Sequence, residues 1–222
     1  MSQKRGEYVR YALVLLAVSA CAALLVAGVY TATSDVIRRN EAMVKQSALH
    51  RVFPDAQEFD FRTFADPHDA DRTVVVTRAD GKPVGYATVG KAAGYGGTIR
   101  VLVGLGPDIQ APTVKLIEVL SHSETPGLGA KIQEVASTET LWSWIGKKLT
   151  GKSKGEAQPL APWFQAQFAG RNAAQVRAFA RNPKEGGEID AITAATVSSR
   201  AVATAVLDGV THVTETVAAP TK

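Results

Sequence analysis

The hydrophobic pattern of the chain changes abruptly near residue 30. From Tyr11 to Tyr30 the sequence carries no charged residue. A helix of this length rises about 30 Å, which is the thickness of the hydrocarbon core of a bilayer. A tyrosine at each end suits the boundary with the lipid headgroups, where a ring can be half apolar and half hydrated. The pattern therefore predicts a transmembrane helix over residues 11–30.

Basic residues precede this helix. Lys4, Arg5 and Arg10 lie on its N-terminal side, and the positive-inside rule places such residues in the cytoplasm. We therefore expect residues 1–10 to be cytoplasmic. The protein is then a single-pass protein of the bacterial inner membrane, and the chain after the helix lies in the periplasm.

Two alternatives involve cleavage of the apolar segment. A signal peptide has an apolar region of roughly 7–15 residues followed by small residues, and the present run is longer. The stretch VSAC, which ends at Cys21, resembles a lipoprotein cleavage box, but AALLVAGVY continues the apolar run beyond it. We therefore predict an uncleaved, single-pass anchor.

The pattern becomes amphipathic after the anchor. Apolar residues are set among charged ones from Thr33 to Leu49, which predicts a helical stalk. The sequence VFPDA at residues 52–56 ends this helix, because proline removes a donor and blocks the preceding turn. We assign residues 31–56 to the stalk and residues 57–222 to one exported domain.

Short β-branched runs bounded by glycine and proline predict a sheet in that domain. The expected strands are residues 73–77, 84–90, 98–105 and 114–120. Short turns join them, one with an Asp-Gly pair typical of a hairpin, so the sheet is expected to be mainly antiparallel. Helices are predicted over residues 138–149 and from about Ala194 to Val213, where apolar residues recur at helical spacing. The fold class is therefore α+β.

Composition excludes several kinds of chemistry. The 222 residues carry a net charge of +4 without a basic stripe, so nucleic-acid binding is not expected. A single cysteine, Cys21, permits neither an internal disulfide nor a thiolate zinc site. The four histidines lack the spacing of a helical metal pair. We predict no catalytic residue and no metal site, so redox activity would require a bound cofactor.

Two glycine-rich segments stand out in the middle of the chain. They are GYGGTI at residues 94–99 and SHSETPGLGAKI at residues 121–132. Glycine permits positive φ and a close approach of backbone to a ligand, although tight turns alone would also explain both. A helix beginning near Gly129 would point free amides at a bound group. His122 and Glu124 are a weak metal candidate, because no further ligands are found.

A cluster of hydroxyl groups, DAITAATVSS, occupies residues 190–199. Asp190 leads into it, Thr193 is the expected N-cap of the last helix, and Thr196 falls in the first turn. Unpaired amides and the positive end of the helix dipole favour an anion such as phosphate there. The alternative is that these hydroxyls only cap the helix.

These three segments occur in the order and at roughly the spacing of one family. They resemble the covalent-FMN domain of the G subunit of the Rnf electron-transport complex. The C subunit of the sodium-translocating NADH:quinone oxidoreductase shares that domain. The resemblance covers nearly the whole chain, including the N-terminal span, and the length is closer to that of the Rnf subunit.

The resemblance implies that FMN is attached by a phosphoester to the hydroxyl of Thr196. A flavin transferase makes this bond from FAD after reading a pattern that falls here on Asp190, Thr193, Ala195 and Thr196. Ala194 stands where glycine is usual. We expect its methyl group to require ordinary helical φ and expect the transferase to tolerate this variant.

The resemblance also implies which residues contact the flavin. Those carried over from the family are Glu124, Thr125, Leu128, Gly129, Thr193, Ala195 and Ser198. The GYGG sequence is assigned to the same neighbourhood.

The function implied is that of an electron-carrier subunit that is not catalytic alone. Its partners would be the membrane, the flavin transferase and the other subunits of a complex that couples oxidation of ferredoxin or NADH to ion translocation. The equivalent subunit of the sodium-pumping quinone reductase is the alternative of the same class. A membrane-anchored periplasmic binding or scaffold domain without a redox role is the alternative of another class.

Overall fold

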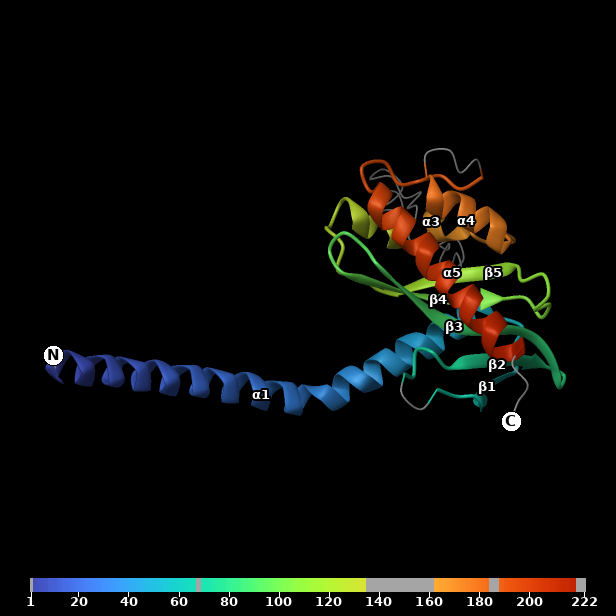
Figure 1. Cartoon of the computed structure of the whole chain (residues 1–222). Helices are drawn as coiled ribbons and strands as arrows, with labels where there is room; N and C mark the ends of the chain where they lie inside the picture. Colours follow the sequence, from blue (N-terminus) through green and yellow to red (C-terminus); the bar gives the residue numbers. More distant parts are fainter. Residues whose placement is uncertain (1, 67–68, 135–161, 184–187, 219–222) are drawn as a thin grey trace, which may run out of the picture. The chain divides into compact units, whose positions relative to one another are not determined.

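The computed structural model describes residues 2–66, 69–134, 162–183 and 188–218 of the chain. It separates into two compact units, of which the first ends at Val44 and the second begins at Lys45. The second unit holds the sheet and the helices that position the functional site (Figure 1). The helix predicted over residues 138–149 lies outside the described residues.

The first unit is formed by one long helix, α1, which spans Ser2–Val52 and continues into the second unit. Among the described residues, α1 is the helix long and apolar enough to cross a membrane. The uncharged stretch and the polar residues after it therefore form one continuous helix. It ends at Val52 because Phe53 precedes a proline, and the α conformation is disfavoured at such a position.

The second unit contains a five-stranded antiparallel sheet, which confirms the α+β fold class. Its strands are β1 (Glu58–Phe64), β2 (Val74–Ala79), β3 (Lys82–Ala93), β4 (Thr98–Leu105) and β5 (Val114–Ser121). Each strand pairs with the next in the sequence, so the order across the sheet is β1-β2-β3-β4-β5. Short turns suffice for such a meander, as the turn sequences indicated.

Four of these strands were predicted and β1 was not. Residues 58–62 do alternate between polar and aromatic side chains, which is the period of a strand. However, β1 lies at the edge of the sheet, most of its side chains are exposed or half-buried, and its register with β2 is irregular between Asp60 and Phe64. Its tertiary partner, β2, therefore contributes more to its strand conformation than its own composition does.

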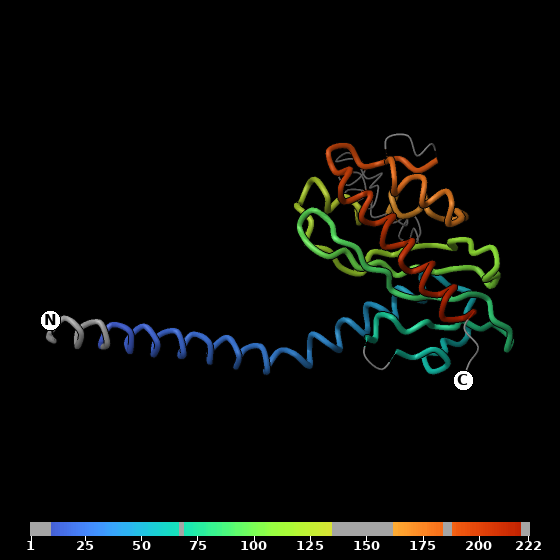
Figure 2. Tube along the Cα trace, viewed as in Figure 1, coloured from blue at the N-terminus to red at the C-terminus, as the bar shows by residue number. Residues whose placement is uncertain are grey.

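The sheet is covered on both faces within the second unit. Helix α5, Thr196–Ala218, crosses one face over β3 and β4 (Figures 1 and 2). Residues 48–52, at the end of α1, cover the other face. Side chains of β4 alternate between the two cores: Val101 and Val103 pack under α5, and Leu102 packs under α1.

Glycines allow α5 to lie close to the sheet. A Cβ atom added at Gly90, in β3, would overlap the carbonyl oxygen of Ala205 in α5. A Cβ at Gly209, in α5, would lie 2.9 Å from Cγ2 of Val103 in β4. These contacts fix the path of α5 across the sheet and therefore the place at which its first turn lies.

Three shorter helices complete the described part of the second unit. They are the 3-10 helix η1 (Gly129–Gln133), α3 (Trp163–Ala166) and α4 (Ala173–Arg181). Helix α4 begins with a capping box, in which Asn172 and Gln175 each bond the other's backbone amide at 2.9 Å. Helices α3 and α4 pack through aromatic rings, since Phe164 of α3 lies 6.5 Å from Phe179 of α4 in a tilted contact. Phe168, between the two helices in the sequence, lies edge-to-face against both rings, at 5.5 and 6.2 Å.

A network of ion pairs joins the loop after β1 to the sheet. Arg100 in β4 donates two hydrogen bonds to Asp71, at 3.0 and 2.7 Å, and the ammonium of Lys91 in β3 lies 3.0 Å from the same carboxylate. Burial alone would raise the pKa of Asp71, but these hydrogen bonds outweigh it and hold that pKa below its ordinary value. The hydrogen bond from Lys91 likewise lowers the pKa of Asp69.

The packing of α5 predicts the effect of Gly90→Ala. The new methyl group must displace the α5 backbone, so the free energy of unfolding should fall by about 1–3 kcal/mol. In a chain of this size, each kcal/mol lowers the melting temperature by roughly 2–4 °C, which calorimetry of the detergent-solubilised protein will measure. Gly106→Ala is the control, because its nearest contact would be a side-chain oxygen of Thr113 at 3.2 Å. An equal loss in both variants would contradict the packing argument.

The Asp71 network predicts a pH dependence of stability. Because the folded pKa values of Asp69 and Asp71 lie below the unfolded ones, their contribution is present above the unfolded pKa of about 4 and is lost as the pH falls through the folded values. Asp71→Asn should cost about 1–3 kcal/mol at pH 7 and should flatten the loss of stability on acidification. Asp35→Asn, which removes an exposed ion pair with Arg38, is the control and should do neither.

Candidate functional site

The two glycine-rich loops meet at a buried carboxylate. Glu124, in the loop after β5, is 5% exposed. Its Oε1 accepts a hydrogen bond from the backbone amide of Gly96 at 3.0 Å. Its Oε2 accepts one from the hydroxyl of Ser198, which is itself buried in the first turn of α5. One side chain thus joins the loop after β3, the loop after β5 and the start of the last helix.

The glycines of both loops are needed for this arrangement. A Cβ atom at Gly94 would overlap Oε1 of Glu124, and one at Gly96 would overlap the backbone just before it. A Cβ at Gly129 would lie 2.5 Å from both Oε2 of Glu124 and the hydroxyl oxygen of Ser198. At these three positions, therefore, the close backbone approach expected of glycine is made to the protein's own atoms.

Residues 125–128, the turn within the second loop, are exposed to solvent. Thr125 and Leu128 are exposed, and the carbonyl oxygen of Thr125 accepts hydrogen bonds from the amides of Leu128 and Ala130, both at 3.2 Å. The helix predicted near Gly129 is present in the tighter 3-10 form as η1. Of the residues carried over as flavin contacts, Thr125 and Leu128 have accessible side chains, whereas both oxygens of Glu124 already have protein partners.

His122 is also engaged within the protein. Its Nδ1 accepts a hydrogen bond from the amide of Glu124 at 3.2 Å, and its Nε2 lies 3.1 Å from Oε1 of Gln133 in η1. The neutral tautomer with its proton on Nε2 satisfies both contacts. Within the described part of the chain, no group of three or more His, Cys, Asp or Glu side chains is placed to hold a metal ion.

A tight turn over residues 192–195 precedes α5. The amide of Ala195 donates to the carbonyl of Ile192 at 2.9 Å, and Ala194 has a φ of +64°. A positive φ at this third position alone is typical of a type II turn, in which glycine is favoured. The expectation that the methyl group of Ala194 requires ordinary helical φ is therefore wrong. The turn imposes the left-handed conformation on an alanine, at a cost of roughly 1–2 kcal/mol.

Thr193 is not the N-cap of the last helix, and that prediction is also wrong. Helix α5 begins at Thr196, and the amide of Ser199 donates to the carbonyl of Ala195 at 3.0 Å, which makes Ala195 the N-cap. Thr193 is exposed on the turn itself. The turn geometry outweighs the preference of threonine for the capping position.

Ser199 has a role that sequence reasoning did not assign. It is fully buried, its hydroxyl accepts a hydrogen bond from the amide of Ile192 and donates one to the carbonyl of Ala195, both at 3.0 Å. It therefore closes the turn from inside. The sequence carries no signal that separates Ser199 from Ser198, because only their directions from α5 distinguish the two hydroxyls.

The start of α5 is suited to an anion. Since the first intrahelical bond is made by the amide of Ser199, the amides of residues 196–198 have no partner four residues before them within the helix. These amides carry the positive end of the dipole of a helix of 23 residues. Thr196 is half-buried in this turn. A phosphate ester on its hydroxyl would place negative charge beside these amides.

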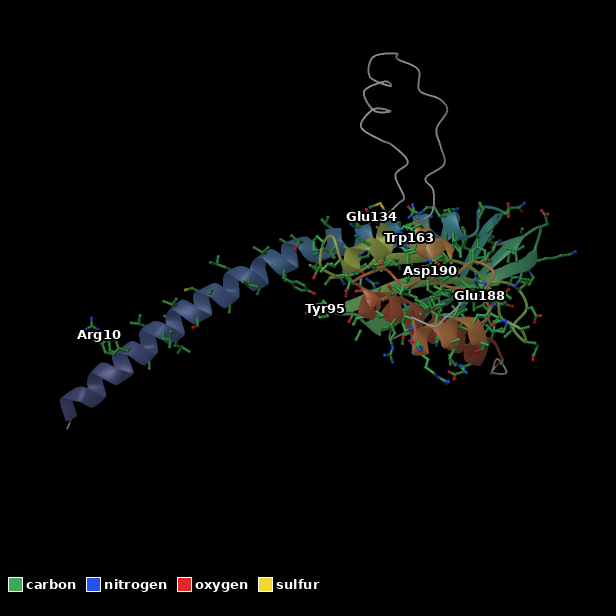
Figure 3. All side chains as sticks on the ribbon, turned by 90° about the horizontal axis from the view of Figure 1, so that it is seen from above. Arg10, Tyr95, Glu134, Trp163, Glu188 and Asp190 are labelled. Atoms are coloured by element: carbon green, nitrogen blue, oxygen red, sulfur yellow. The ribbon has the colours of Figure 1, made fainter. Side chains whose placement is uncertain are left out.

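The surface near this turn also suits a flat aromatic group. Three exposed apolar residues come from the three segments that Glu124 joins: Tyr95 is 78% exposed, Val197 55% and Leu128 47%. The side chain of Tyr95 projects outward from the loop after β3 (Figure 3). Each of these side chains is open to contact by a bound group, because each is exposed and belongs to a segment held by Glu124. The residues present therefore fit a nucleotide with an apolar ring, such as FMN, better than they fit phosphate alone.

Asp190 lies on a segment that is held separately. Its amide donates to Oε1 of Gln167 at 2.7 Å, and Nε2 of Gln167 donates to its carbonyl at 3.3 Å. Glu188, which lies near Asp190 in Figure 3, accepts hydrogen bonds from Gln175, at 2.6 Å, and from Arg171. The backbone before the turn is therefore fixed, while Asp190 is exposed to solvent.

Two family models match the chain. The FMN-binding domain matches residues 94–211, which include both glycine loops and the start of α5. The RnfG N-terminal region matches residues 1–52, which end where α1 ends. The first match covers more than half of the chain.

Several curated proteins are similar along most of their length. The G subunit of an ion-translocating oxidoreductase complex from Methanosarcina acetivorans is 29% identical over 93% of this chain and 95% of its own length. The protein of the same name from Vibrio atlanticus is 31% identical over 90% of this chain and 88% of its own. The G subunit of a proton-translocating ferredoxin:NAD(+) oxidoreductase complex from Clostridium ljungdahlii is 25% identical over 86% of this chain and 83% of its own length.

The resemblance to the Rnf subunit is thus confirmed over nearly the whole chain. The protein belongs to the RnfG family, the G subunits of ion-translocating oxidoreductase complexes, and has an FMN-binding domain at residues 94–211.

Proposed function

We propose that this chain is an electron-carrier subunit of a membrane-bound, ion-translocating oxidoreductase of the Rnf type, with FMN attached through its phosphate to Thr196. The FMN-binding match and the names of the relatives support this proposal. Because one relative is named for ferredoxin and NAD(+), we propose the same class of donor and acceptor here, reached through the other subunits.

The position of Thr196 is the observation that carries the proposal. It lies in the first turn of α5, beside three amides without intrahelical partners, and its side chain is half-buried. The segment before it is fixed in backbone yet exposed at Asp190 and Thr193. An acceptor hydroxyl on an ordered, accessible segment is what a modifying transferase requires.

Each part of the site has a role toward the flavin. FMN, when bound, supplies the one-electron chemistry that the side chains lack. The amides of residues 196–198 hold its phosphate, and the covalent bond retains the cofactor outside the cytoplasm. Thr125, Leu128 and Tyr95 are accessible to its ring. Glu124 and Ser198 are both buried, and their hydrogen bond holds the loop after β5 to the start of α5.

The two alternatives are less well supported. The match of residues 1–52 to the RnfG N-terminal region favours the Rnf subunit over the C subunit of the quinone reductase. A scaffold without a redox role would not need an FMN-binding domain, which covers residues 94–211.

We also propose the orientation of the chain. Lys4, Arg5 and Arg10 precede the apolar stretch, so the N-terminus remains cytoplasmic and residues 57–222 fold in the periplasm. There a flavin transferase would attach FMN from FAD.

The acceptor is tested by Thr196→Val, which keeps the shape of the side chain and removes its hydroxyl. In cells that contain the transferase, the denatured wild-type band should fluoresce under ultraviolet light, and that of the variant should not. Thr193→Val is the matched control: it should weaken the fluorescence without abolishing it, because Thr193 lies in the recognition turn and carries no flavin. Complete loss in Thr193→Val alone would show that the acceptor is misassigned.

The strained turn is tested by Ala194→Gly. Relief of the positive φ outweighs the greater backbone freedom of glycine in the unfolded chain, so the protein should be stabilised by up to about 1 kcal/mol. The initial rate of flavin attachment should also rise, because the turn reaches its conformation more easily. Ala169→Gly changes an exposed alanine without positive φ and should slightly destabilise the protein. The turn would not be strained if both variants lost stability equally.

A further inference from the structure

Both carboxylate oxygens of Glu124, one of the candidate flavin contacts, are already bonded within the protein. Its Oε1 is bound by the Gly96 amide at 3.0 Å, its Oε2 is bound by the Ser198 hydroxyl, and the side chain is 5% exposed. A carboxylate that is buried and satisfied in this way is poorly placed to bind a ligand directly. Glu124 therefore acts on the site indirectly, through the Gly96 amide and the Ser198 hydroxyl that it binds.

Those groups belong to three segments that approach the flavin attachment point. Gly96 is next to Tyr95, and Ser198 lies two residues after Thr196 on the same helical turn. Gly129 packs against Glu124 and Ser198 together, since a Cβ there would be 2.5 Å from an oxygen of each. Displacement of the carboxylate would therefore free the first turn of α5 from both loops at once.

We propose that Glu124 is a positioning residue that locks the two glycine loops to the first turn of α5 and thereby holds the Thr196 hydroxyl in the geometry that the flavin transferase needs. The inference rests on the proposed function. Positioning has a large effect on rate, because a displacement of about 1 Å at a reacting atom can slow a reaction by two orders of magnitude.

Three variants distinguish the hydrogen bonds that Glu124 makes from its carboxylate group itself. Glu124→Ala removes both hydrogen bonds. Glu124→Gln keeps them, because its amide oxygen can accept from Gly96 and its amide nitrogen can donate to the Ser198 oxygen. Ser198→Ala removes one link with little change in volume, and it is informative even if Glu124→Ala fails to fold.

The experiment measures the initial rate at which the full chain in detergent acquires fluorescent flavin from FAD and purified transferase. We expect Glu124→Ala to be at least tenfold slower than the wild type, Ser198→Ala to be slower by a smaller factor, and Glu124→Gln to stay within threefold. The double variant Glu124→Ala/Ser198→Ala should be no slower than Glu124→Ala, because both substitutions remove the same Glu124–Ser198 hydrogen bond.

A stability control distinguishes positioning from general loss of structure. Val213 is fully buried in α5, about 22 Å along the helix from Ser198. Val213→Ala should lower the melting temperature while leaving the rate of flavin attachment unchanged at a temperature where all variants are folded.

Several outcomes would overturn the inference. These are a rate for Glu124→Ala at or above the wild type, additive effects in the double variant, a loss in Glu124→Gln as large as in Glu124→Ala, or an equal loss in Val213→Ala. If the wild type itself acquires no flavin, the proposed function fails instead, so the two failures are distinguishable.

Discussion

The close contact between α5 and the sheet is the constraint on which the site depends. At Gly90 the backbone of β3 meets the carbonyl of Ala205, and at Gly209 the helix lies against Val103 of β4. A helix held this closely cannot slide along the sheet, because packed interiors resist such a shift. Its first turn therefore lies at the end of the sheet where the loops after β3 and β5 emerge, so packing some distance away brings Thr196, the proposed attachment residue, close to those loops.

The chain places carboxylates in two different settings around this framework. Asp71 is paired with Arg100 and the ammonium of Lys91, so its charge is balanced by cations. Glu124 is bound by an amide and a hydroxyl, and no ion pair to it occurs among the described residues. A buried polar side chain needs hydrogen-bond partners, and the two partners of Glu124 come from two other segments of the chain. Through these two hydrogen bonds Glu124 joins three segments in one place.

The three segments could be selected from the sequence, but the use of each residue could not. Glycine density drew attention to both loops, yet it does not reveal whether the close neighbour is a ligand or, as at Gly94, Gly96 and Gly129, the side chain and backbone around Glu124. Residue type likewise suggested a cap at Thr193. The type II turn at Ala194 moved the start of the helix beyond it, because a turn depends on how the chain enters the helix and not on one residue's preference.

The sequence pattern was sufficient to predict the elements that depend on neighbouring residues in the chain. The uncharged stretch from Tyr11 to Tyr30, the short β-branched runs of β2 to β5 and the apolar spacing of α5 follow from side-chain hydrophobicity and strand preference along a regular backbone. The edge strand β1, the left-handed Ala194, and the directions of Ser198 and Ser199 toward different partners follow from contacts between residues far apart in the chain. Periodicity reports which face of an element is apolar, and only tertiary structure decides what each polar group on that face will meet.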